Sequence, residues 1–466
     1  MHNIFRSSLS KTLLAVGIAS ATSVSQASSF ALIEQSASGQ GSAYAGAAAL
    51  GEDASTIFFN PAGMTRLSGQ QVIIAGHLIS PNADFKNNGS TTASPGIPNV
   101  NITGPDSTTG DPAFVPNFYY SADIGNDTFV GVGVNVPFGL STEYDDGWVG
   151  RYHALRSEIS TININPSIAW KATEKLSVGF GISIQYMEIE LTNNIDSLAA
   201  CANLDPTLAG CGAAGLNTVF SDSTQDSHVK LDGDSLELGW NAGILYDIDD
   251  KNRIGVAYRS AIKHSVEGNA TYNLDPNLSA FLGAAPIPPG FKVLENTTLE
   301  ASAELPETFS FSYVGEINSK WTALFDWTWT GWSVLDTIVI RQAGGIPGAE
   351  PTLDLAYQNT NRYSVGVNYQ HNPKLIYRGG LALDQTPIRS PESTSARIPG
   401  NDRTWLSFGA GYAPSASWSF DVGYSHLFIS DTDINNNGGS SSSGATLTGT
   451  YESSVDILSA QANFNF

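Results

Sequence analysis

The sequence predicts an all-β protein, a 14-stranded antiparallel transmembrane β-barrel with an N-terminal hatch (plug) inside the lumen. Three observations lead to this fold class. Apolar and polar residues alternate with a period of two, the connections alternate between short turns and long loops, and a segment rich in Gly and Ala precedes the first strand. The composition agrees, because 41% of the residues are hydrophobic, 10% are aromatic and only 14% are charged.

The charge balance of the chain excludes some partners. The 466 residues include 22 Lys and Arg against 44 Asp and Glu, which gives a net charge of −22. We expect no nucleic acid as a partner, because binding to a phosphate backbone needs a surface dominated by Lys and Arg. Disorder is disfavoured, because so many apolar residues build a large surface that is buried or faces lipid.

Residues 1–27 are typical of a secretory signal peptide. Arg6 and Lys11 are positive, residues 13–19 form a short apolar stretch, and the small residue Ala27 ends the segment. The apolar stretch is too short to cross a membrane as a helix. The alternative, a buried helix of a cytosolic protein, fits this order of features less well.

Residues 28–69 do not follow the strand pattern and predict the hatch. Residues 38–49 are almost all small, and residues 60–63 are typical of a turn, so the segment is suited to compact folding inside a lumen. The alternative, a mobile periplasmic tail, conflicts with its large apolar side chains, which need cover. The candidate hatch residues are Phe58, Asn60, Pro61 and Ala62.

Residues 70–466 predict the barrel. Residues 176–186, 236–247 and 418–425 each place apolar side chains on one face, opposite a face rich in Gly, Ser and Asn and poor in Lys. A soluble β-sandwich would expose more Lys and Glu. These segments therefore favour a strand with lipid on one side and a crowded lumen on the other.

The connections give the number of strands. Short turns are expected near residues 124–127, 172–175, 248–252, 317–320, 371–374 and 413–417. Long segments are expected near residues 80–112, 139–157, 191–234, 274–300, 341–356, 386–402 and 430–452. These 13 connections join 14 strands, and this sorting of short turns and long loops is typical of bacterial outer-membrane barrels. The terminal Phe466 is similar to the assembly signal of such barrels.

The lumen and the loops indicate hydrophobic cargo. Met187 and Ile189 continue the inward face of the fifth strand, so the upper lumen is apolar unless a β-bulge exchanges the two faces. Residues 278–291, with Phe281 and Leu282, are too apolar for a solvated loop. Exposed apolar surface usually marks a binding site.

Four arginines on or beside strands are candidates for binding a carboxylate head group, namely Arg259, Arg341, Arg397 and Arg403. The alternative for each is a salt bridge with one of the many carboxylates. The only cysteines, Cys201 and Cys211, are candidates for a disulfide after export. Two cysteines without a nearby His do not make a metal site, and we expect no metal ion and no cofactor.

Several motifs occur in a characteristic order. Residues 36–46 are followed by Asp53-Ala54 and Asn60-Pro61-Ala62, and then by residues 138–144, 239–246, 258–260 and 397–403. Through these motifs, essentially the whole mature chain resembles the FadL-type family of outer-membrane long-chain fatty-acid transporters, which also includes aromatic-hydrocarbon channels.

The resemblance implies a monomeric barrel and a passive route. A ligand is captured on apolar extracellular loops, passes to a pocket in the lumen, and leaves sideways after the hatch moves. The exit is an inward kink of the third strand, here at Val136-Pro137-Phe138-Gly139, where Pro and Gly weaken the strand. The sequence departs from the family at Val339, where fatty-acid members can carry a Lys that Arg341 is expected to replace. Glu188 and Glu190 stand where the family has basic residues.

The first hypothesis is passive transport of long-chain fatty acids across the bacterial outer membrane, and the alternative is a channel for monoaromatic or other hydrophobic compounds. A hydrolase is a further class, but the sequence has no Gly-x-Ser-x-Gly motif, and we do not expect an enzyme. A porin for polar solutes would conduct ions, which a closed hatch prevents. The expected surroundings are outer-membrane lipid and lipopolysaccharide.

Overall fold

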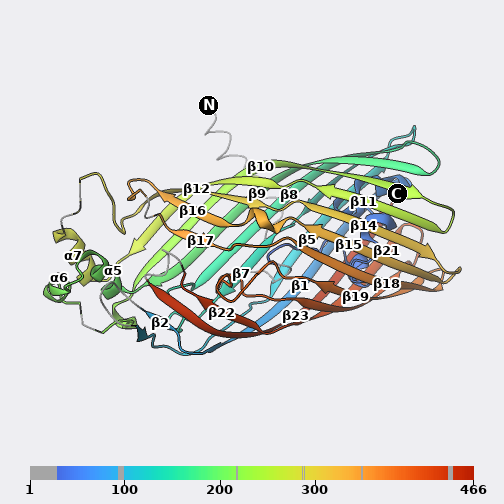
Figure 1. The fold of residues 1–466 in the computed structure, drawn as a ribbon. Helices are drawn as coiled ribbons and strands as arrows, with labels where there is room; N and C mark the ends of the chain where they lie inside the picture. Colours follow the sequence, from blue (N-terminus) through green and yellow to red (C-terminus); the bar gives the residue numbers. More distant parts are fainter. Residues whose placement is uncertain are drawn as a thin grey trace.

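The computed structural model describes residues 29–92, 99–216, 219–285, 287, 289–347, 350–438 and 444–466. The strands form one closed antiparallel barrel of 14 strands, with short helices inside it at one end (Figure 1). The predicted fold class is therefore confirmed. The expected signal peptide, residues 1–27, lies outside the described residues.

Each barrel strand pairs with the strands that precede and follow it in the sequence, and several barrel strands consist of two shorter strands separated by a break. In chain order they are β1 (Gln70–Asn87), β5 (Ala113–Asp123), β6 (Thr128–Asn135) with β7 (Gly139–Glu143), β8 (Arg156–Lys171), β9 (Leu176–Ile195), β10 (Ser227–Asp247), β11 (Asn252–Arg259) with β12 (Ile262–Asn273), β13 (Thr297–Leu305) with β14 (Thr308–Glu316), β15 (Trp321–Thr330) with β16 (Thr337–Gln342), β18 (Thr360–Asn372), β19 (Leu375–Asp384), β20 (Arg403–Tyr412), β21 (Trp418–Ile429) with β22 (Thr432–Asn436), and β23 (Ala445–Asn465). The first and last strands, β1 and β23, pair with each other and close the barrel.

All six predicted short turns join neighbouring barrel strands, and the long connections lie at the other end of the barrel. The strands extend further into the long connections than the sequence predicts: β9 ends at Ile195 and β10 begins at Ser227, within the expected long segment 191–234. Above the apolar band the outer face meets water, so the alternation that marks a strand in the sequence is lost there. The long connections also carry the short strands β2 (Thr91–Thr92), β3 (Val100–Asn101), β4 (Thr108–Thr109) and β17 (Thr352–Asp354).

Alternate side chains of each barrel strand face the lipid and the lumen. In β9, Phe180 and Ile182 are each 46% exposed, whereas Ser183 and Gln185 are buried. Polar side chains inside the lumen bond to one another and to the hatch. Because every strand of a closed barrel has a partner on both sides, its backbone polar groups are satisfied and the strands can cross a membrane.

The hatch fills the lumen at the turn end of the barrel (Figure 1). It consists of α2 (Ala37–Gln40), α3 (Ala47–Leu50), α4 (Thr56–Phe59) and the 3-10 helix η1 (Pro61–Arg66). Small residues let the hatch approach the wall: a Cβ atom on Gly41 would lie 2.8 Å from the Cα atom of Gly409. Asn60 caps η1, accepting from the Ala62 N–H at 3.0 Å, and its Nδ2 donates to the carbonyl oxygen of Ile244 in β10 at 3.0 Å. None of the described helices is long and apolar enough to cross a membrane.

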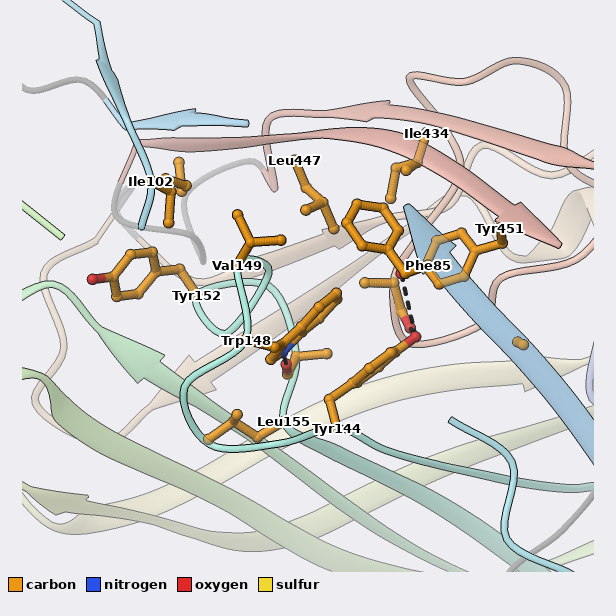
Figure 2. Packing of buried hydrophobic residues seen from close by; sticks show 14 residues of the cluster. Phe85, Ile102, Tyr144, Trp148, Val149, Tyr152, Leu155, Ile434, Leu447 and Tyr451 are labelled. Carbon is orange, nitrogen blue, oxygen red and sulfur yellow. Dashed lines mark hydrogen bonds between the residues drawn. The ribbon is translucent and has the colours of Figure 1, made fainter. Parts of the chain in front are cut away.

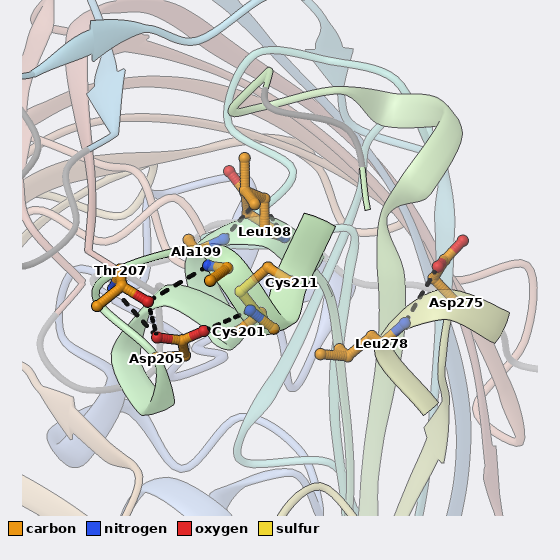
Figure 3. The surroundings of a disulfide bond; sticks show 11 residues. Leu198, Ala199, Cys201, Asp205, Thr207, Cys211, Asp275 and Leu278 are labelled. Carbon is orange, nitrogen blue, oxygen red and sulfur yellow. Dashed lines mark hydrogen bonds between the residues drawn. A yellow bond between two sulfur atoms is a disulfide. The ribbon is translucent and has the colours of Figure 1, made fainter. Parts of the chain in front are cut away.

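Two clusters of buried apolar residues organise the loop end of the barrel. In the loop between β7 and β8, Tyr144 stacks on Trp148 with ring centroids 4.0 Å apart, and Trp148 meets Phe85 of β1 edge to face at 5.4 Å (Figure 2). The second cluster joins α5 (Ser197–Leu204), α6 (Ala209–Ala213) and α7 (Pro276–Ala284) around a disulfide between Cys201 and Cys211 (Figure 3). We call this second cluster the loop cluster.

Candidate functional site

A cavity of about 130 Å³ lies between the hatch and the barrel wall. Aromatic side chains form much of its lining, including Phe58 and Phe59 of the hatch, and Trp332 of the 3-10 helix η3 (Trp332–Val334). The wall also contributes charged side chains, which are Arg259 (β11), Asp326 (β15), Arg362 (β18) and Asp384 (β19). A mainly apolar cavity with a few polar groups is the usual composition of a site for a small hydrophobic ligand.

Among the four predicted arginines, Arg259 is the one that lines this cavity. It lies at the end of β11, where its Nη2 donates to the carbonyl oxygen of Phe58 at 2.8 Å and its Nη1 donates to the Ser183 hydroxyl at 3.2 Å. Its guanidinium also lies 4.3 Å from the centre of the Phe58 ring. These partners are all neutral, so the positive charge remains available to an anion in the cavity.

Arg362 of β18 is a second guanidinium in the cavity, and it was not among the predicted residues. Its Nη2 donates to the carbonyl oxygen of Ala43 in the hatch at 3.0 Å, and its guanidinium lies 5.0 Å from the centre of the Trp405 ring. Its Nε and Nη1 atoms are buried without a hydrogen-bond partner among the described residues. The alternation of β18 could have identified it, because Thr360, Arg362 and Ser364 share the buried face.

Arg403 lies at the start of β20 and is buried, with 3% of its surface exposed. It pairs across the sheet with Asp384 of β19, which lines the cavity. Its Nε and Nη1 atoms also lack a hydrogen-bond partner within the described part of the chain. The structure therefore brings Arg403 close to the cavity without placing it in the lining.

The structure places the other two predicted arginines elsewhere. Arg397 is buried in the loop between β19 and β20, where its Nη1 donates to the Ser157 hydroxyl at 3.0 Å and to the carbonyl oxygen of Thr192 at 3.2 Å. Burial lowers the pKa of Arg397 to about 10. Arg341 is exposed on the outer face of β16, because its neighbour Ile340 is buried in the lumen and successive side chains alternate. Arg341 therefore lies outside the lumen and away from the cavity.

Apolar side chains close the lumen between the cavity and the loops. The ring of Trp332 lies 5.1 Å from the ring of Phe30 and 6.3 Å from that of Phe138. Met187 is buried in the same cluster, and Ile189 packs against it. The pairing of β9 with β10 continues through both residues without a shift in register, so they stay on the lumen face and the upper lumen is apolar.

The third barrel strand is interrupted at residues 136–138, between β6 and β7. Asn135 pairs with Asn163 and Gly139 with Ser160, so three residues lie opposite two of β8, which is a bulge. On the other side, the pairing of β5 with β6 begins only at Phe118, and no described residue of the third strand pairs with residues 113–117 of β5. The interruption therefore leaves a gap in the wall's hydrogen bonding.

Hatch residues 30–32 pair with the interrupted strand. The Leu32 N–H donates to the carbonyl oxygen of Pro137 at 2.8 Å, the Gly139 N–H donates to that of Phe30 at 2.9 Å, and Ala31 forms an antiparallel bridge with Phe138. The hatch thus supplies the hydrogen bonds that the interrupted strand cannot make within the barrel. We call residues 30–32 the seal.

The predicted hatch residues divide into two groups. Phe58 and Pro61 line the cavity, whereas Asn60 and Ala62 connect the hatch to the wall, Asn60 by hydrogen bonds and Ala62 by packing against Leu245 of β10. Among the residues that the structure describes, no group of three or more His, Cys, Asp or Glu is suited to holding a metal ion.

Phe281 and Leu282 lie on α7 and pack, partly buried, against the disulfide-linked helices of the loop cluster. The sequence predicts an apolar loop here, and the structure shows a helix because Asp275 caps it, accepting from the Asn277 N–H at 2.8 Å. Much of the apolar surface of these loops is therefore used in packing. Leu204, the last residue of α5, is one of the apolar side chains that stay exposed.

Comparison with known proteins agrees with this architecture. A family model described as outer membrane protein transport protein (OMPP1/FadL/TodX) matches residues 18–466. The chain is 29% identical over 422 residues to a long-chain fatty acid transport protein of Escherichia coli O6:H1, with 90% of each chain covered. It is 31% identical over 428 residues to outer membrane protein P1 of Haemophilus influenzae, covering 90% of this chain and 89% of that protein.

Solved structures share the fold. A FadL homologue of Pseudomonas aeruginosa superposes with a TM-score of 0.82 at 24% identity, covering 94% of this chain and all of the other. The toluene transporter TbuX of Ralstonia pickettii superposes with a TM-score of 0.63 at 16% identity, covering 91% of this chain and 97% of the other. With the match over nearly its whole length, the chain belongs to the FadL/TodX family of outer-membrane transport proteins.

Proposed function

We propose that this protein transports long-chain fatty acids passively across the outer membrane and that the cavity between hatch and wall holds the ligand during passage. The observation that carries the proposal is the composition of this cavity, in which apolar side chains accompany two buried guanidiniums, Arg259 and Arg362, with neutral hydrogen-bond partners. A carboxylate accepts charge-assisted hydrogen bonds from such donors while the acyl chain contacts the apolar lining. The similarity to long-chain fatty acid transport proteins supports this assignment.

The proposed route begins at the loop cluster and ends at the interruption of the third strand, residues 136–139. A ligand that reaches the cavity leaves sideways into the membrane when the seal moves out of the gap. The lateral exit keeps the acyl chain out of water, which saves about 0.8 kcal/mol per CH₂ group. On this proposal the protein acts as a monomer among outer-membrane lipid and lipopolysaccharide and catalyses no reaction.

The size of the cavity favours a second candidate function. A volume of about 130 Å³ suits a monoaromatic compound better than a whole long acyl chain, which needs the hatch to shift before it fits. A channel for aromatic hydrocarbons is therefore the alternative, and the shared fold with the toluene transporter TbuX agrees with it.

Uptake by cells that lack their own transporter and express this protein tests both candidates. We expect labelled oleate to enter faster than in cells with an empty vector, and labelled toluene to enter at the background rate. Toluene uptake without oleate uptake would overturn the fatty-acid assignment in favour of the aromatic channel. Absence of both, with the barrel correctly inserted, would overturn both.

A further inference from the structure

Glu34 is the only charged residue in residues 29–51, and its side chain is completely buried in the lumen. Neither of its carboxylate oxygens has a hydrogen-bond partner among the described residues. A buried carboxylate without hydrogen bonds is costly, so its position calls for an explanation. Burial raises the pKa of Glu34 to about 7, although its own backbone N–H and then the charges of two arginines oppose this shift.

The two arginines whose charges act on Glu34 are Arg362 and Arg403, the same side chains that carry unused buried donors. Asp384 is the other charged residue close to Glu34. These four side chains come from the hatch and from β18, β19 and β20, and their formal charges cancel when all are ionised. A ligand carboxylate would give these four side chains and the ligand a net charge of −1. The net charge stays at zero if Glu34 takes up a proton or moves away from the arginines.

Glu34 is joined directly to the residues that close the gap in the third strand. Its own carbonyl oxygen accepts from Asn117 Nδ2 of β5 at 3.0 Å. The next residue, Gln35, donates from Nε2 to the carbonyl oxygen of Val136 at 3.0 Å. Glu34 follows the seal by two positions, so we expect displacement of its side chain to pull on the backbone of the seal.

We propose that Glu34 competes with the carboxylate of the ligand for Arg362 and Arg403, so that an acid displaces the seal whereas an uncharged compound of the same length does not. The ligand brings one negative charge into the group, and Glu34 removes one by leaving or by taking up a proton from water. This inference rests on the proposed function and adds a chemical cause for movement of the hatch. It also makes the charge of the ligand, as well as its length, a condition for exit.

Binding to the full-length barrel, purified in detergent, tests the competition. The probes are hexadecanesulfonate, which stays ionised at all relevant pH values, and hexadecanol, which is neutral. At pH 8 we expect Glu34→Gln to bind the sulfonate about tenfold more tightly while its affinity for the alcohol stays unchanged. Equal effects on both ligands, or weaker sulfonate binding, would overturn the proposal. The matched control is Glu52→Gln, which removes the hatch carboxylate 3.3 Å from Arg378, and it should leave the ratio of the two affinities unchanged.

The pH dependence gives a second readout. The charged and titratable groups around Glu34 are Arg362, Arg403, Asp384 and Tyr44, with Tyr119 beside Tyr44. Because Glu34 becomes neutral as the pH falls through about 7, the wild-type protein should bind the sulfonate more tightly at pH 6 than at pH 8. Glu34→Gln should show no such change. A pH dependence that persists in Glu34→Gln would assign it to another group and reject this role.

Movement of the seal is measured by labelling a single thiol. Both native cysteines are in the disulfide, so Leu32→Cys, at a position that is 2% exposed, introduces the only free thiol. We expect hexadecanesulfonate to speed maleimide labelling several-fold and hexadecanol to have no effect. Equal acceleration by both ligands would refute the proposal. Ala31→Cys replaces Leu32→Cys if the latter does not show the heat-dependent gel shift of a folded barrel.

Failure of the proposed transport function and failure of the proposed role of Glu34 give different results. If the wild-type protein does not take up oleate in cells, the proposed function is wrong. If uptake is normal but the sulfonate and the alcohol label the seal equally, transport stands and only the role of Glu34 is rejected.

Discussion

At the scale of single residues, two guanidiniums define the chemistry of the cavity. Arg259 and Arg362 bond to carbonyl oxygens of the hatch, and their charges are not neutralised by direct salt bridges to described residues. A buried guanidinium with unused N–H donors is unfavourable, and the carboxylate of an acidic ligand can accept from those donors. The same two arginines donate hydrogen bonds to the hatch, so a ligand that binds them competes with the hatch for these donors.

Replacing Arg362 with Gln should weaken binding of oleate much more than binding of oleyl alcohol. Hydrogen bonds to charged groups contribute about 1.5–3 kcal/mol, so we expect a loss of about 10- to 100-fold for the acid. Equilibrium binding to the purified barrel measures both affinities. Arg341→Gln is the control, because Arg341 is exposed outside the lumen and its replacement should change neither affinity. Equal losses for the acid and the alcohol would contradict a head-group role for Arg362.

The contrast between Arg341 and Arg362 shows what the sequence could predict at this scale. Both lie on strands, and the sequence shows that each is a rare cation, but it does not say which face of the barrel wall each occupies. Arg362 lies on the face shared with Thr360 and Ser364, so its strand alternation was informative. Glu34 was recognisable as an isolated charge in a small-residue segment, yet its nearness to β18 and β20 depends on the folded barrel.

At the scale of elements, the interruption of the third strand and the seal depend on each other. Residues 136–139 do not pair with β5, and the seal bonds to the backbone of Pro137 and Gly139. A straight third strand would restore the pairing with residues 113–117 and leave no gap for a ligand. The proposed lateral exit therefore requires that the third strand stay interrupted at residues 136–139.

Replacing Pro137 and Gly139 together with Val should abolish oleate uptake while the barrel still assembles. Val restores the missing N–H at position 137 and favours extended backbone at both positions. Uptake is measured in cells, and assembly is measured by the heat-dependent gel shift. Pro166→Val is the matched control, because Pro166 lies in β8 opposite Val132, away from the interruption, and should leave uptake intact. Normal uptake by the double variant would exclude this exit.

The disulfide should stabilise the loop cluster and leave the barrel unaffected. Closing a loop of about 10 residues contributes roughly 3 kcal/mol in the chain-entropy description. We therefore expect Cys201→Ser with Cys211→Ser to raise hydrogen exchange in α5, α6 and α7 by tens- to hundredfold, without raising it in β9 or β10. Reduction of the wild-type protein should reproduce the result. Faster exchange throughout the barrel would show that the bond supports more than the loops.

Elements were predicted well where lipid imposes a pattern and poorly where it does not. The six short turns and the even strand count follow from alternation in the apolar band. The strand extension to Ile195 and the helices of the loop cluster lie where water surrounds the chain, and local caps such as Asp196 and Asp275 determine their structure. The hatch helices have only four to six residues, too short for a helical period to be visible.

At the scale of the whole molecule, the hatch lies inside the lumen at the turn end, and we expect it to limit ion flow through the barrel. Its buried helices contact strands around the lumen, with glycines such as Gly41 and Gly409 allowing the closest approach. We expect the wild-type protein in a planar bilayer to show little steady ion current. Deletion of residues 29–67 should raise the steady current, because it uncovers the polar side chains that line the lumen at the level of the hatch. A silent deletion variant that is correctly inserted would mean that the loops alone close the barrel.

The pairing of β1 with β23 sets the order in which this protein must be built. These strands match along 17 residue pairs, from Gln71 opposite Asn465 to Asn87 opposite Gly449, and the Gln70 N–H donates to the carbonyl oxygen of Phe466 at 3.0 Å. The sheet therefore cannot close into a cylinder until β23 has been made, and until then two long edges remain open to other chains. Until β1 and β23 meet, a chain on its way to the membrane therefore carries two edges that can pair with other chains and aggregate.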